Sequence, residues 1–125
     1  MNDSQYSTLK SLLESKMWEA ALATVESLLP SHPLAVQLHL LRGQLIQLQD
    51  ENTSYPLDEV EKSLQRAVEL EATYFDALVE LMHFYDAVCP DMPKAITYAK
   101  QVKTIAQQAL DEASAILAEA VESSA

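Results

Sequence analysis

The chain has 125 residues, with 8 basic and 19 acidic side chains and a formal net charge of −11. This length suits one domain whose core needs no disulfide. A single glycine and the absence of Asn-Gly and Asp-Gly pairs favour helices over strands. The acidic charge disfavours binding to nucleic acid or to an anionic membrane surface, because both would be repelled.

Cysteine content and the N-terminal residues indicate a compartment. Cys89 is the one cysteine, so no disulfide can form within the chain, which fits a reducing environment. The first residues show neither the basic nor the apolar region of a secretory signal, and no apolar run approaches the roughly 18 residues of a membrane span. We therefore expect a cytoplasmic protein.

Apolar periodicity and the prolines divide the chain into six predicted helices. Apolar residues recur every three or four positions, and Pro33, Pro56 and Pro90 fall between the periodic stretches, where proline is tolerated. The third helix is apolar on nearly all sides and should lie centrally. The last stretch gives one long helix, or two with a break near 107–108. The expected helices span about 4–15, 18–29, 34–49, 57–71, 74–88 and 92–122.

Three of these helices carry the same small and bulky apolar pattern, with members four and then three residues apart. The pattern recurs at a spacing near 34 residues, and the second unit holds about five extra residues in a 50–56 loop. A fixed period in this range indicates stacked units rather than one mixed core. The trios are Ala21, Val25 and Leu28; Val60, Leu64 and Ala67; and Ala95, Ala99 and Val102.

These repeats resemble the tetratricopeptide family. Pro33 and Gly43 stand ten residues apart, as do the closing proline of one family unit and the helix-A glycine of the next. Leu78, Leu81 and Tyr85 match the bulky, leucine and aromatic positions of a helix A. The resemblance covers roughly residues 5–107.

The match is to degenerate units, since Arg42 replaces a leucine, Met82 a glycine and Ala72 the closing proline of the family pattern. The resemblance implies an all-α, right-handed stack of antiparallel helix pairs. The implied units span about 2–35, 36–72 and 73–107, followed by a capping helix over about 108–122.

In the family, helices A line a concave face that binds a peptide or a helix. Carried over by position, this face would be amide-rich in the middle and acidic toward the third unit. Lys10 would be its lone cation, which disfavours an anionic peptide tail and favours a basic or amphipathic partner protein. The implied partner-binding residues are Gln37, Leu40, Gln44, Gln47, Asp76, Val79, Glu80, His83 and Asp86.

The sequence therefore predicts a non-enzymatic interaction module: an adaptor, an assembly factor or a small chaperone. An acidic antidote to a basic toxin or nuclease is an alternative that rests on charge alone. A metal-dependent enzyme using Glu80, His83 and Asp86 ranks last, because the second Glu-x-x-His copy of a carboxylate di-iron site is missing. We predict no catalytic residue, cofactor or metal. An apolar stripe over 110–122 suggests a homodimer through the C-terminal helix.

Overall fold

The computed structural model describes residues 1–49 and 55–124, and all of its regular elements are helical. The all-α prediction is confirmed for this part of the chain, whereas most of the expected 50–56 loop lies outside the described residues. The elements are α1 (Asp3–Glu14), α2 (Trp18–Leu28), α3 (Val36–Gln47), α4 (Leu57–Leu70), α5 (Phe75–His83), the π-helical turn η1 (Phe84–Val88) and α6 (Met92–Ser124).

Local interactions fix how α1 begins and how it turns into α2. The Asn2 side chain accepts a hydrogen bond from the backbone N–H of Gln5 at 2.9 Å, while the Gln5 side chain accepts one from the backbone N–H of Asn2 at 3.0 Å. This reciprocal pair satisfies donors that a helix start leaves free. After α1, Lys16 adopts φ 58°, a left-handed conformation that reverses the chain toward α2.

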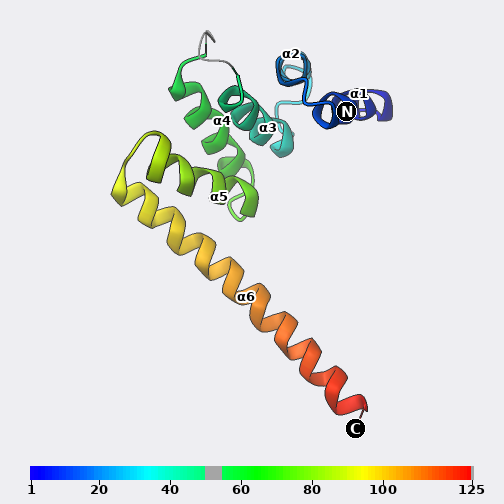
Figure 1. Ribbon diagram of the computed structural model, residues 1–125, viewed down its shortest axis with the longest axis vertical. Helices are drawn as coiled ribbons and strands as arrows, with labels where there is room; N and C mark the ends of the chain where they lie inside the picture. Colours follow the sequence, from blue (N-terminus) through cyan, green and yellow to red (C-terminus); the bar gives the residue numbers. More distant parts are fainter. Residues whose placement is uncertain (50–54, 125) are drawn as a thin grey trace.

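Each helix packs mainly against its neighbours in chain order, and the most extensive contact joins α3 to α4. The central position predicted for the third helix is confirmed, since α3 contacts α2 on one side and α4 on the other. Figure 1 shows this body of short helices, from which the long α6 extends. The only glycine, Gly43, lies at the α3–α4 contact, where an added Cβ would stand 2.9 Å from a side-chain carbon of Leu64.

The repeated apolar trios form much of the core. All members of the trios on α2 and α4 are buried, and Val25, Val60 and Leu64 have no exposed surface. On α6, Ala95 is buried, while Ala99 and Val102 are only partly buried. The difference follows from position, because α6 is the last helix and packs mainly against α5 and η1.

The helix expected over 74–88 is not uniform. It is α-helical through His83 and then widens into η1, where the N–H of Cys89 donates to the carbonyl of Phe84 at 2.8 Å, five residues back. Cys89 leaves the helix with φ −132° and ψ 79°, as the residue before a proline tends to do.

The C-terminal helix α6 is continuous over 33 residues, a length of about 50 Å. The alternative of two helices with a break near 107–108 is therefore wrong. Every residue from 106 to 124 is exposed, and Figure 1 shows this part projecting away from the body. None of the described helices combines the length and the apolar character needed to cross a bilayer.

Candidate functional site

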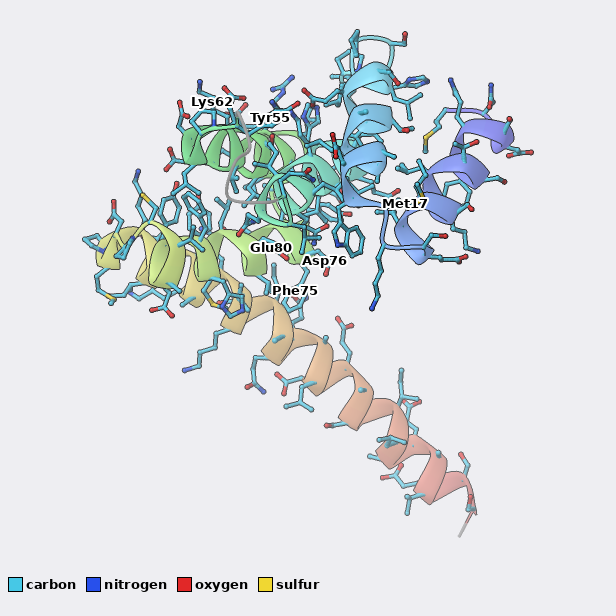
Figure 2. The ribbon with its side chains drawn as sticks, turned by 45° about the horizontal axis from the view of Figure 1, so that its top comes forward. Met17, Tyr55, Lys62, Phe75, Asp76 and Glu80 are labelled. Atoms are coloured by element: carbon cyan, nitrogen blue, oxygen red, sulfur yellow. The ribbon has the colours of Figure 1, made fainter. Side chains whose placement is uncertain are left out.

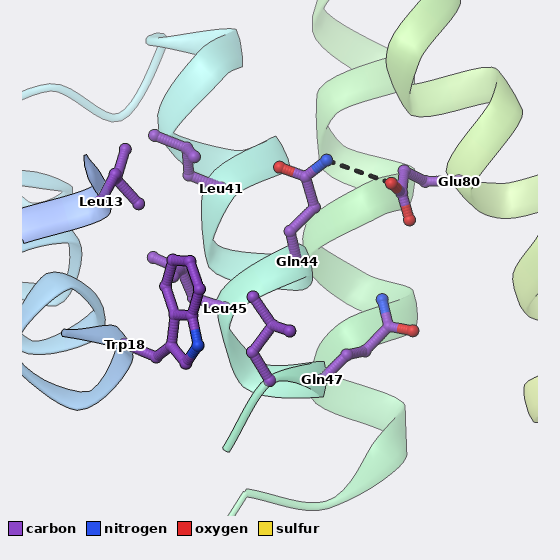
Figure 3. Close-up of a pocket in the computed structure, with 8 residues that line it drawn as sticks. Leu13, Trp18, Leu41, Gln44, Leu45, Gln47 and Glu80 are labelled. Carbon is purple, nitrogen blue, oxygen red and sulfur yellow. Dashed lines mark hydrogen bonds between the residues drawn. The ribbon is translucent and has the colours of Figure 1, made fainter. Parts of the chain in front are cut away.

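A hollow of about 440 Å³ opens between the N-terminal helix pair, α3 and α5. Its position follows from the packing order: α3 lies centrally, with α1 and α2 toward one edge of the hollow and α5 toward the other (Figure 3). The lining residues are Leu13, Trp18, Leu41, Gln44, Leu45, Gln47, Leu48 and Glu80.

One side of the hollow is apolar. Leu13, Trp18 and Leu41 are half-buried, so part of each side chain faces solvent. Leu48, the residue after α3, is 50% exposed. Figure 3 shows Leu13, Leu41, Trp18 and Leu45 gathered on the same side. A concave apolar surface of this kind can bury a side chain of another molecule.

The other side of the hollow is polar and acidic. Gln44 Nε2 donates a 3.0 Å hydrogen bond to Glu80 Oε1 across the space between α3 and α5 (Figure 3). Within the described residues no lysine or arginine forms an ion pair with Glu80. Asp76, one turn earlier on the same helix, is exposed (Figure 2). Among the described residues, the Glu80 carboxylate is therefore bonded only to a neutral amide donor, and it can bind a cation from another molecule.

The nine residues assigned by family position are spread over several surfaces. Gln44, Gln47 and Glu80 line the hollow just described. Gln37 lines a smaller hollow of about 110 Å³ at the α1–α3 edge. His83 and Asp86 line a third, of about 260 Å³, beside the start of α6. The remaining three, Leu40, Asp76 and Val79, line none of these hollows.

Leu40 is a correction to the predicted surface. Its exposed fraction is 6%, and it belongs to the hydrophobic core. Because α3 is covered by α2 and by α4, a residue on that helix can face the core even at a position that is open in a regular repeat. The apolar lining at Leu13, Trp18, Leu41 and Leu48 was not in the predicted set. One feature of the sequence indicated this apolar lining, namely that the third helix is apolar on nearly all sides.

Arg42 holds the helices behind the hollow together. Its guanidinium bonds to Glu26 on α2, to Glu59 Oε2 on α4 at 3.0 Å and to Ser63 Oγ at 2.7 Å. The Tyr55 hydroxyl donates to the second oxygen of Glu26 at 3.0 Å. Burial alone would lower the pKa of Arg42, but the two carboxylates raise it. The arginine that departs from the family pattern is thus a polar clamp joining α2, α3 and α4.

A second network joins α4 to α6 through Tyr85. Its hydroxyl donates to Glu61 Oε2 at 2.6 Å and accepts from Gln65 Nε2 at 2.9 Å. The ring stacks on Tyr98 with centroids 5.8 Å apart, and Lys94 Nζ lies 5.1 Å from the ring centroid. Burial, followed by the hydrogen bond to Glu61, raises the pKa of Tyr85. We assign this tyrosine to packing.

The metal hypothesis finds no geometric basis in the described residues. Glu80 lines the hollow beside α3, whereas His83 and Asp86 line the one beside α6. In that part of the chain no group of three His, Cys, Asp or Glu side chains could hold a metal ion. Cys89 is exposed.

The hollow therefore offers groups for recognition: an apolar side, two amides and one carboxylate. It can bury an apolar side chain and place a cation beside it. No family model, curated protein or solved structure matches the chain.

Proposed function

We propose that this protein is a non-enzymatic interaction module, built as a tetratricopeptide-like stack, that binds a basic, amphipathic segment of another protein. The observation that carries the proposal is the hollow, in which an apolar side from α1, α2 and α3 faces the carboxylate of Glu80. The stack is supported by packing between chain neighbours and by the buried trios.

The chemistry of the hollow selects the partner. The hollow is open to solvent, and its volume of about 440 Å³ is enough to take an apolar side chain of a partner. A leucine, isoleucine or methionine anchor would cover Trp18 and Leu48, and a lysine or arginine one turn along the partner would reach Glu80. The net charge of −11 would also speed the approach of a basic segment, an effect that salt screens.

Affinity purification from the native host tests the apolar half of the site, with proteins quantified by mass spectrometry. Leu48→Ser should lower recovery of the partner by roughly tenfold. Leu57→Ser is the matched control, because Leu57 is 52% exposed against 50% for Leu48 and does not line the hollow. Equal recovery with both variants, or no partner above background with the wild type, would contradict the proposal.

Charge reversal tests the acidic half. Calorimetry with the partner segment identified in this way should show that Glu80→Lys lowers the affinity. The loss of affinity should become smaller when the salt concentration is raised. Glu80→Gln should have a smaller effect, since it removes the charge without adding repulsion. Asp86→Lys is the control at a different hollow. A larger effect at Asp86 than at Glu80 would place the interface beside the start of α6.

A further inference from the structure

The distal half of α6, residues 106–124, presents an apolar face that nothing in the described chain covers. Leu110 is 60% exposed, Ile116 66%, Leu117 67% and Val121 72%. Figure 1 shows the segment extending into solvent, away from every other helix. Contiguous apolar surface of this kind is rare on a monomer and marks a contact site.

The apolar face of the distal half continues the side of α6 that packs against α5 in the proximal half. Five turns of an α-helix are about 18 residues, so Ala95, Ala99 and Val102 recur on the same side of α6 as Ala113, Leu117 and Ala120. The first trio is buried or partly buried, on the half of α6 that packs against α5. The second trio has the same spacing of four and then three residues, and all three of its members are exposed. The distal half is therefore built to receive another helix.

The positions of the charged residues on α6 indicate what kind of helix would cover this apolar face. With about 100° between successive residues, the distal carboxylates point away from the apolar face: Asp111, Glu112, Glu119 and Glu122. The positions that flank the face include Gln107 and Ser114, which are uncharged. A basic partner helix would need acidic residues at such flanks. Neutral flanks instead let two identical segments approach without a direct clash of like charges.

Residue size gives the orientation. A seam with spacings of four and three residues runs through Ala106, Leu110, Ala113, Leu117, Ala120 and Ser124. In an antiparallel pair with its two-fold axis at position 115, Leu110 faces Ala120 of the second copy and Leu117 faces Ala113. Each large seam residue then meets a small one, and each contact occurs twice, as a two-fold interface requires. Position 115 is also the midpoint of 106–124, so this register uses the whole free length.

We propose that the distal half of α6 pairs antiparallel with the same segment of a second copy of this chain, placing the two bodies at opposite ends of a two-helix rod. The paired stretch is about 28 Å long, which buries less than the roughly 800 Å² per partner of a standard interface. The dimer should therefore be reversible, with a dissociation constant on the order of 10 µM.

Sedimentation velocity over a concentration series tests the pairing. Leu117→Asp should raise the dimer dissociation constant by roughly tenfold or more, because it places a charge in the seam on both copies. Ala118→Asp is the matched control: it adds the same residue one position along, on the outer side of the helix, and should change the constant less than about threefold. Circular dichroism should give equal helicity for both variants.

Salt dependence separates a second copy from a basic partner. Two copies that each carry −11 repel one another, so raising NaCl from about 50 to about 500 mM should tighten the dimer. Binding of a basic helix would weaken over the same range.

Disulfide trapping tests the register in a Cys89→Ser background. Ser114→Cys lies beside the seam next to the two-fold axis and should form a cross-linked dimer on mild oxidation. Ala115→Cys faces outward and should not. A wild type that stays monomeric to about 300 µM, a dimer indifferent to Leu117→Asp, or equal trapping at both positions would overturn the proposal.

Discussion

The close approach of α3 and α4 at Gly43 makes Gly43→Ala an informative perturbation. An alanine Cβ would lie 2.9 Å from Leu64 Cδ2, 3.0 Å from Leu64 Cγ and 3.5 Å from the carbonyl oxygen of Val60. Leu64 has no exposed surface, so its side chain can make room only by moving within the packed core. The substitution should therefore strain the contact that joins these two helices.

Two opposing effects set the magnitude. Alanine in a helix interior is favoured over glycine by about 1 kcal/mol, while overfilling a packed site costs about 1–3 kcal/mol. We expect Gly43→Ala to lower the free energy of unfolding by about 1 kcal/mol. Leu64→Ala alone should lower it by about 3 kcal/mol, because it leaves a cavity.

The double variant separates the two effects. With Leu64 shortened, the two side-chain atoms nearest to the added Cβ at position 43 are gone, and the Cβ partly fills the cavity. Gly43→Ala should then raise the free energy of unfolding by about 1 kcal/mol relative to Leu64→Ala alone, a change of sign. Urea unfolding followed by circular dichroism gives all four values. Stabilisation by Gly43→Ala in both backgrounds would refute the close packing of α3 on α4.

Two further variants test the polar networks. Arg42→Ala should lower the free energy of unfolding by about 2 kcal/mol, since it leaves Glu26 without its cation, while Glu59 keeps Lys62 at 3.4 Å. Arg66→Ala, at an exposed pair, should change the free energy of unfolding by less than about 0.5 kcal/mol. Equal effects of the two substitutions would contradict the clamp. Tyr85→Phe should cost about 1–2 kcal/mol at neutral pH. Because the folded state raises the pKa of Tyr85, the unfolded chain ionises first, so wild-type stability should fall as the pH rises above about 10. That fall should be shallower in Tyr85→Phe, and equal slopes in urea titrations at several alkaline pH values would contradict this reasoning.

Helix positions and the buried trios could be predicted from the sequence because they depend on local periodicity. Val60, Leu64 and Ala67 are buried as expected, since a face with this spacing has to be covered. The break considered near 107–108 was wrong because Gln107 and Gln108 are good helix formers and nothing interrupts the backbone there. The widening at η1 was missed because apolar periodicity does not distinguish a π-helical turn at the end of a helix from a continued α-helix.

The candidate site was predicted less well than the fold. Gln44, Gln47 and Glu80, which the family positions assign to a partner-binding face, line one hollow, because both helices that carry them were placed correctly. The same carry-over failed at Leu40, since burial depends on which neighbours cover α3. It also missed Leu48, whose exposure follows from the end of α3, a boundary that periodicity does not fix.

Arg42 illustrates a third limit. In the sequence it is only a departure from a leucine position. Its role depends on Glu26 and Glu59, which lie 16 and 17 residues away in the chain and converge only in the folded protein. Long-range ion pairs carry no local pattern that sequence analysis could detect.

Site-specific photo-crosslinking in the native host tests the central claim, that the hollow beside α3 is where a partner binds. A photoreactive phenylalanine derivative would replace Leu48 in one variant and the equally exposed Leu57 in another. We predict a crosslink from position 48 to a basic, amphipathic segment of one partner protein, and none from position 57. The same crosslinks from both positions, or a partner trapped only from position 57, would contradict the account.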